Sequence, residues 1–355
     1  MTAPGPAPAP VAVPARAGRL RRPSRRGLLT ALAAALLLLA LVAVRVLVGT
    51  PMVPVDLALR VIGGEQIPGI SFIVMDHRLP TAAVALLAGV AFGLSGTVFQ
   101  TLLRNPLASP DVIGVTLGAS AGAVIAMAFF AADGRALFWC ALLGGLATAA
   151  LLMIVAGVDR PGSAGAVDNR FVLVGIGIAA ALSALVSYLL TRLSLQSAGD
   201  AMHWLIGSLS SSTWERAAVL AIALAVLIPA LSLLVVRLRI LQLGDDTATS
   251  LGLPVPRTRI ALILVAVTLS ALTVAVTGPL SFVAFLAGPI ARMLAGRPSF
   301  ALAAVVGAVI VLLADIAGQN LFGGTELPAG VVTGALGAPF LLWMLTRTPT
   351  SGSGR

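Results

Sequence analysis

The sequence predicts an all-α polytopic membrane protein with ten transmembrane helices, and three observations lead to this prediction. Of the 355 residues, 59% are hydrophobic and only 10% are charged, whereas a soluble globular chain carries about 25% charged residues. Uncharged runs recur along the chain, and a spanning helix needs about 20 apolar residues. The arginines gather in alternate connections between these runs. This composition excludes a soluble enzyme or a DNA-binding protein as a description of the whole chain.

The uncharged runs place the expected helices. Nine runs fall between successive charged residues, at 28–44, 79–103, 112–132, 136–158, 171–191, 217–236, 260–291, 298–314 and 327–346. The run at 260–291 is too long for one crossing, and Gly278-Pro279 interrupts it. Because proline breaks a helix and glycine permits a turn, we expect two helices here, which makes ten. The expected membrane domain is 28–347.

The distribution of arginine predicts the orientation of the chain. The formal net charge is +10, and all 23 basic residues are arginines. With a cytoplasmic N-terminus and ten alternating crossings, seventeen arginines fall inside and five outside, and Arg45 lies near the outer end of the first helix. Positive charge concentrates in cytoplasmic segments of membrane proteins. We therefore expect both termini in the cytoplasm, and we expect the basic charge to reflect membrane orientation and not a nucleic-acid partner.

The two ends of the chain are expected to be tails. Residues 1–14 are rich in proline and alanine and carry no charge, which predicts disorder within a basic N-terminal tail, 1–27. Ser24 to Leu29 resembles a twin-arginine export signal, although a positive-inside anchor explains the same residues. Residues 348–355 are expected to form a flexible C-terminal tail.

Few residues at membrane depth could carry chemistry. Ionisable side chains there are costly and usually functional. Asp315 lies near the outer end of the ninth predicted helix, and Glu326 precedes the tenth. Two histidines and Cys140 leave no spacing typical of zinc ligands, so no cofactor is expected in this chain. An ion-coupled secondary transporter that uses Asp315 or Glu326 stays an alternative, and a membrane enzyme is a more distant one.

The connection between the second and third predicted helices, 100–119, carries turn signals. Asn105-Pro106 and Ser109-Pro110 favour turns, and Ser109 or Asp111 can cap the helix that follows. We therefore expect a structured connection and not a plain loop.

A second connection, 238–257, is predicted to contain a short helix. Gly244 precedes it, Asp245 and Asp246 favour its N-terminal turn, and Gly252 ends it. A capped helix on the cytoplasmic face is a natural docking surface for a partner. A connector helix that lies on lipid is the alternative, and the spacing alone does not decide between them.

Taken in order, these segments resemble the FecCD-type permease family of ATP-binding-cassette (ABC) importers for iron-siderophores, haem and cobalamin. The matching motifs are Arg78-Leu79-Pro80, Asn105-Pro106-Leu107-Ala108 with Pro110 and Gly114, Leu243-Gly244 through Leu251-Gly252, Ala314-Asp315, Glu326-Leu327-Pro328 and Gly337-Ala338-Pro339. They keep the order of the family and cover about residues 28–346. The resemblance implies the type II ABC importer permease fold, in the bacterial cytoplasmic (inner) membrane.

The resemblance also implies the substrate and the partners. The chain would be a permease subunit for a metal chelate. A ferric siderophore is expected because siderophore permeases make up much of the family. Its partners would be a second permease subunit, identical or related, two cytoplasmic ABC ATPases and an extracytoplasmic substrate-binding protein. The sequence has no lysine and hence no Walker A motif, so ATP hydrolysis must come from another chain. We therefore expect a transport subunit and not an enzyme.

Finally, the resemblance assigns roles to single residues. The implied ATPase coupling residues are Gly244, Asp245, Asp246, Leu251 and Gly252. The implied contacts for the binding protein are Arg78 and Gln319, where Gln319 replaces an arginine of the family. The implied structural positions are Asn105, Pro106, Pro110, Gly114, Asp315, Glu326, Pro328 and Pro339. Gly288-Pro289 departs from the Pro-His of the family, which leaves the geometry of the eighth helix open.

Overall fold

The computed structural model of the chain describes residues 25–158, 164–321 and 326–347, and helices make up most of these ranges. Most of the expected N-terminal tail and all of the expected C-terminal tail lie outside the described residues, as does Arg160, one of the arginines expected on the cytoplasmic side. Within the described ranges, residues up to Leu37 belong to one unit and those from Leu38 onward to a second. Helix α1 (Arg25–Leu47) begins in the first unit and ends in the second, to which all the other described helices belong.

Six helical segments of the described chain are long and apolar enough to cross a membrane. They are Phe72–Leu102, Gly134–Ala156, Arg170–Arg192, Trp214–Leu241, Val255–Thr277 and Phe300–Asn320. Four shorter apolar segments accompany them, Leu32–Leu47, Val115–Phe130, Val283–Ala295 and Ala329–Met344. Each segment overlaps an uncharged run of the sequence, so the all-α membrane fold is confirmed. Ten crossings stay a prediction, because the four shorter segments fall below the usual spanning length.

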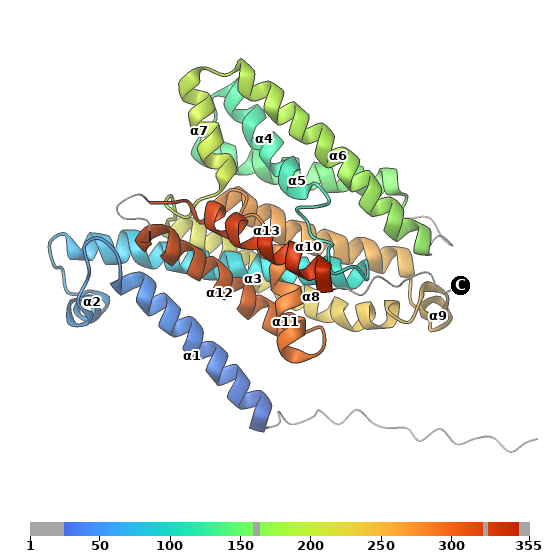
Figure 1. Cartoon of the computed structure of the whole chain (residues 1–355), viewed down its shortest axis with the longest axis horizontal. Helices are drawn as coiled ribbons and strands as arrows, with labels where there is room; N and C mark the ends of the chain where they lie inside the picture. Colours follow the sequence, from blue (N-terminus) through green and yellow to red (C-terminus); the bar gives the residue numbers. More distant parts are fainter. Residues whose placement is uncertain (1–24, 159–163, 322–325, 348–355) are drawn as a thin grey trace, which may run out of the picture. The chain divides into compact units, whose positions relative to one another are not determined.

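The helices of the second unit pack in two groups (Figure 1). The first group has α3 (Leu79–Leu102) at its centre, contacted by α8, α10, α11 and α12. The second group consists of α5, α6 and α7 packed on α4 (Val115–Phe130), and α10 joins the two groups. The remaining bounds are α2 (Val55–Ile62), the π-helix η1 (Phe72–Arg78), α5 (Gly134–Ala156), α6 (Ala164–Arg192), α7 (Leu195–Ile206), α8 (Trp214–Leu241), α9 (Asp245–Ser250), α10 (Val255–Thr277), α11 (Val283–Ala295), α12 (Phe300–Asn320) and α13 (Ala329–Arg347).

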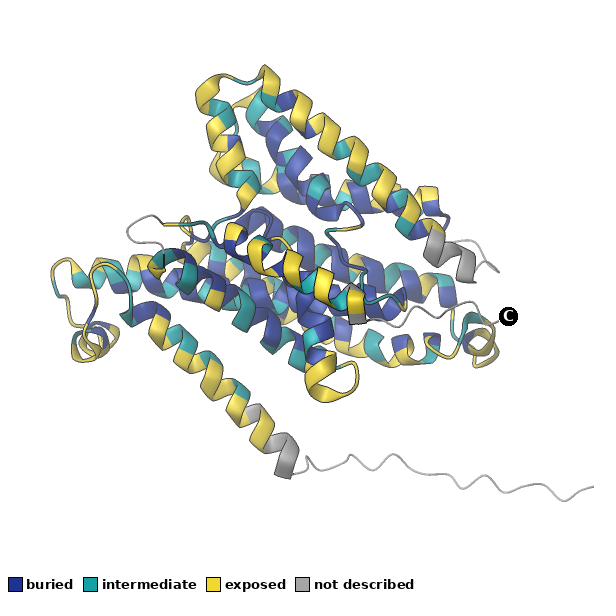
Figure 2. Cartoon of the chain, in the orientation of Figure 1, coloured by how far each residue is buried: buried dark blue, intermediate teal, exposed yellow. Residues whose placement is uncertain are grey.

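Helix α3 is buried along most of its length, as the dark ribbon in Figure 2 shows. Small residues let helices approach closely where lipid gives no hydrophobic drive for association. A Cβ atom added at Gly93 would lie 2.2 Å from the carbonyl oxygen of Ala303 on α12. One added at Gly96 would lie 1.8 Å from the carbonyl oxygen of Ala284 on α11. The glycines of α3 therefore set its distance from two neighbouring helices.

The predicted break after α10 is confirmed. Helix α10 ends at Thr277, Gly278 has a positive φ of 68°, and α11 begins at Val283. Pro289 lies inside α11 and has no N–H to donate to the carbonyl of Phe285. The side chain of Gln100 replaces that bond, because its Nε2 atom donates to the Phe285 oxygen at 3.0 Å. The departure at Gly288-Pro289 is thus accommodated within a helix.

Three elements of the structure have no counterpart among the sequence predictions, namely α2, η1 and α7. Both α2 and α7 are short and carry charged residues, so neither forms an uncharged run. The π-helix η1 extends α3 at its N-terminal end, where charged residues interrupt the apolar pattern. Trp214, the first residue of α8, donates from its indole Nε1 to the Met75 carbonyl oxygen at 2.8 Å, which ties α8 to this π-helix.

Candidate functional site

The short helix predicted in the connection 238–257 is present as α9. Gly244 precedes it with a φ of 106°, and Gly252 follows it with a φ of 81°, so both glycines hold backbone conformations that other residues rarely adopt. The side chains of Leu243 and Leu251, on either side of α9, are each 63% exposed. The loop therefore presents a defined helical turn flanked by two exposed apolar side chains.

The base of this loop is anchored in the helix bundle. Arg259 on α10 is buried, and its Nη2 atom lies 3.4 Å from the carboxylate of Asp245 at the start of α9. Arg104, just after α3, donates from Nη2 to the Leu241 carbonyl oxygen at 2.8 Å, at the C-terminus of α8. In contrast, Asp246 faces outward and is exposed. The loop is thus held at its base by two arginines and exposed at its tip.

The connection between α3 and α4 is a compact series of turns. Asn105 accepts the backbone N–H of Leu107 on its side-chain oxygen at 2.9 Å, and Pro106 within this turn and Pro110 after it restrict the backbone. Gly114 has a φ of 87° and directly precedes α4.

The expectation that Ser109 or Asp111 caps α4 is wrong, because the N-cap residue is Gly114 and no side-chain cap bonds to the backbone N–H groups of the first turn. Ser109 instead accepts the Val112 N–H at 3.3 Å, within the turn before the helix. Asp111 accepts from the hydroxyl of Thr116 at 2.5 Å. Both side chains make local hydrogen bonds that stabilise the turn, and Gly114 is the N-cap residue of α4.

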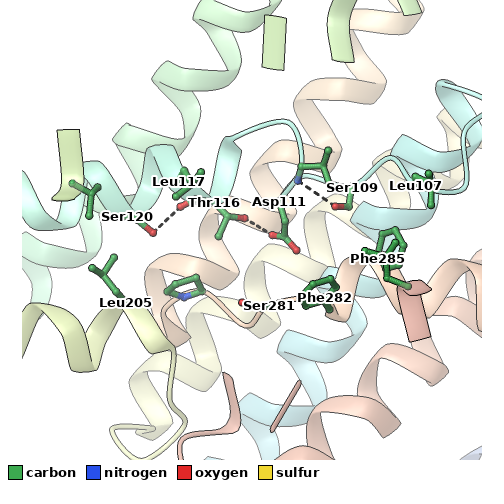
Figure 3. A pocket seen from close by; sticks show the side chains of 14 residues that line it. Leu107, Ser109, Asp111, Thr116, Leu117, Ser120, Leu205, Ser281, Phe282 and Phe285 are labelled. Atoms are coloured by element: carbon green, nitrogen blue, oxygen red, sulfur yellow. Dashed lines mark hydrogen bonds between the residues drawn. The ribbon is translucent and has the colours of Figure 1, made fainter. Parts of the chain in front are cut away.

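A cavity of about 550 Å³ opens beside this connection (Figure 3). Its walls come from the α3–α4 connection, α4, α6, α7, the α10–α11 connection, α11 and α13. The rings of Phe282 and Phe285 lie edge to face, with centroids 6.1 Å apart, on one side of it. Phe282 has a φ of 65°, which is a strained value for a bulky residue. Backbone strain of this kind is frequent at functional sites. Most of the lining is apolar, and Asp111 supplies its ionisable group.

Helix α13 meets the rest of the bundle through the predicted motif residues. Glu326 is exposed, and Pro328 and Pro339 lie before and within the helix respectively. A Cβ atom added at Gly330 would lie 1.8 Å from the carbonyl oxygen of Ile206, at the end of α7. The backbone N–H of Gly330 also donates to the Gly207 carbonyl at 3.1 Å, so Gly330, two residues after Pro328, fixes the start of α13 against the α7–α8 connection.

At the other end of α3, two arginines are buried. Arg78 is 4% exposed, and it donates to the carbonyl oxygens of Val46 at 2.9 Å and of Pro51 at 2.6 Å. Arg45 pairs with Asp315 of α12, and both side chains are almost completely buried. Sequence reasoning left Arg45 without a role, because nothing in a single sequence indicates a contact between residues 270 positions apart.

Gln319 completes the arrangement around Asp315. Its Nε2 atom donates to the Asp315 carboxylate at 3.2 Å. The two residues predicted to meet a binding protein, Arg78 and Gln319, thus both have partners inside the chain, and a docking role for them stays a prediction. Among the described residues, no group of three or more His, Cys, Asp or Glu side chains is placed to hold a metal ion.

The described helices form an apolar bundle with an anchored loop exposed at one end and a cavity lined by several helices, an arrangement that suits a membrane transport subunit. The chain belongs to the FecCD transport family, whose model matches residues 30–347. It is 40% identical over 287 residues to the ferric enterobactin transport system permease protein FepG of Escherichia coli, covering 79% of this chain and 84% of that protein. It is 38% identical to the achromobactin transport system permease protein CbrC of Dickeya dadantii, covering 88% and 90%.

A solved structure supports the same fold. An inward-facing metal-chelate-type ABC transporter matches with a TM-score of 0.77 at 27% identity, covering 89% of this chain and 98% of that one. The type II importer fold, which the sequence motifs implied, is thereby confirmed.

Proposed function

We propose that this chain is the permease subunit of an ABC importer that takes up a ferric siderophore, driven by ATP hydrolysis on a separate subunit. The observation that carries the proposal is the α9 loop, fixed at its base by Arg259 and Arg104 and exposed at its tip. The same Arg104 stands at the start of the connection that leads to the cavity. A displacement of the α9 loop would therefore also move the cavity wall, because the α3–α4 connection joins Arg104 to that wall.

The partners follow from this arrangement. Gly244, Asp245, Asp246, Leu251 and Gly252 would place α9 in a cleft of a cytoplasmic ATPase, with one ATPase for each of two permease subunits. The second permease is a copy of this chain or a relative. A substrate-binding protein would deliver the chelate at the opposite face, with Arg78 and Gln319 as its proposed contacts. The permease family of the chain and the names of its relatives support this assembly.

The orientation of the chain is part of the proposal. The N-terminus, α9 and the C-terminus would be cytoplasmic, in accord with the arginine bias. Reporter fusions at Gly134 and Gly199 should then report an extracytoplasmic position. A cytoplasmic signal at either residue would contradict the model of ten crossings.

The alternative of an ion-coupled carrier is not favoured. Its coupling carboxylate would have to exchange ions, but Asp315 is buried against Arg45 and also accepts a bond from Gln319. Glu326 is exposed and lies outside the helices.

The experiment that tests the substrate is an uptake panel in a strain that lacks the gene for this chain. Iron-siderophores, haem and cobalamin would each be supplied as the labelled compound, with and without the chain restored. We expect restored uptake of at least one ferric siderophore and unchanged uptake of haem and cobalamin. Restoration of haem or cobalamin uptake alone would contradict the proposed substrate.

A further inference from the structure

The cavity beside the α3–α4 connection contains one polar atom that the protein leaves without a partner. Asp111 uses its Oδ1 atom to accept from Thr116, whereas its Oδ2 atom is buried and accepts no hydrogen bond within the described chain. A buried carboxylate oxygen without a donor costs free energy. Such an atom at a cavity wall points to a ligand, or to a proton, that satisfies it.

The other polar groups of the cavity are already engaged or neutral. The hydroxyl of Ser120 donates to the Thr116 carbonyl at 2.9 Å, and that of Thr116 is held by Asp111 (Figure 3). Among the described residues that line the cavity, those of α4, α6, α7, α11, α13 and the α10–α11 connection include no further ionisable group. The charge that a molecule meets in this cavity is therefore the charge of Asp111.

The protonation state of Asp111 should matter for what the cavity admits. In surroundings of low dielectric constant, charges interact strongly and are weakly screened. An ionised Asp111 would repel an anionic chelate that enters beside Phe282 and Phe285, whereas a protonated Asp111 would offer it a hydrogen-bond donor. A neutral chelate with N–H or O–H groups meets no such repulsion.

We propose that this cavity is a contact site for the iron chelate and that Asp111 makes the binding of anionic chelates, but not of neutral ones, dependent on prior protonation of its carboxyl group. This inference rests on the proposed function as an iron-chelate permease.

The carboxyl group of Asp111 should change its protonation state in a pH range where binding can be measured. Burial raises the pKa of Asp111 to about 6, and the hydrogen bond from Thr116 opposes that rise. With that pKa, about 3% of the carboxyl groups are protonated at pH 7.5 and about three quarters at pH 5.5, by the ordinary titration relation. The affinity for an anionic chelate should therefore rise about 20-fold between these pH values.

The test uses the nucleotide-free complex of the permease with its ATPases, in nanodiscs and without the binding protein. Equilibrium binding of two radio-iron chelates, a triply anionic tris-catecholate and a neutral trihydroxamate, is measured at pH 7.5 and pH 5.5. We expect the ratio of anionic to neutral affinity to rise about 20-fold in the wild type. In Asp111→Asn, which cannot ionise, the rise should disappear, so that any change left belongs to the chelates themselves.

Two further variants sharpen the result. Thr116→Val removes a donor that lowers the pKa of Asp111, so the transition should move to higher pH. Asp133→Asn removes an exposed carboxylate outside the cavity and should leave the transition unchanged. If the ratio of anionic to neutral affinity depended on pH equally in the wild type and in Asp111→Asn, the role of Asp111 would be overturned. The proposed function would not be affected by that result. No binding of either chelate by the wild-type complex would instead contradict the proposed function.

Discussion

Breaking the buried pair of Arg45 and Asp315 from one side should be far more damaging than removing both partners. The exposed fractions of the two side chains are 1% and 5%. In Asp315→Leu, the guanidinium of Arg45 would stay buried with no carboxylate, and its Nη2 atom already lacks a partner. Loss of one partner of a buried pair costs about 3–5 kcal/mol, whereas replacing both with apolar residues of similar volume is often neutral.

The assay is a thermal-stability series on the purified chain in detergent, read as the monodisperse fraction after heating. About 1 kcal/mol shifts the midpoint by roughly 2 °C for a chain of this size, so Asp315→Leu should lower it by roughly 6–10 °C. The double variant Arg45→Met/Asp315→Leu should recover most of that loss, which gives a coupling energy between the two sites. A double variant as unstable as the single one would refute the reasoning. Transport retained by the double variant would also exclude Asp315 as an ion-coupling group.

Four other substitutions test the packing, the coupling loop and the outer face. Gly96→Ala should destabilise the chain by at least about 1–3 kcal/mol, because its Cβ would meet a backbone carbonyl oxygen; Gly177→Ala, which has open space, is the control in the same thermal assay. Gly252→Pro cannot keep a φ of 81° and should abolish transport while the complex still assembles, as co-purification with the ATPase and a transport assay would show. Gln319→Arg should strengthen association with the binding protein and make it more salt-sensitive, whereas Arg78→Glu should reduce both association and folded protein, since Arg78 is buried against backbone carbonyls. Co-purification over a salt series checks both variants, and full association of folded Arg78→Glu would contradict the docking role.

The membrane fold could be predicted because composition and the spacing of charges determine it. Lipid excludes charged residues, so the uncharged runs mark the helices, and the glycine and proline at positions 278 and 279 mark where one run divides. The short helix α9 was also predictable, because Gly244 and Gly252 are required at its ends by backbone conformation.

The parts that could not be predicted depend on contacts between distant segments. Arg45 and Asp315 pair across 270 positions, and Gln100 satisfies the Phe285 carbonyl that Pro289 leaves open. Neither contact has a local pattern in the sequence. Asp111 was read as a helix cap because capping residues are recognised by local spacing, whereas its actual surroundings come from several helices.

The most direct test of the central claim is iron-chelate uptake by proteoliposomes that contain this chain, its ATPase subunits and the binding protein. The account predicts uptake that requires ATP on the ATPase side, is blocked by vanadate and is unaffected by an uncoupler. Uptake that proceeds without ATP hydrolysis and collapses when the uncoupler is added would contradict it, because the energy would then come from an ion gradient.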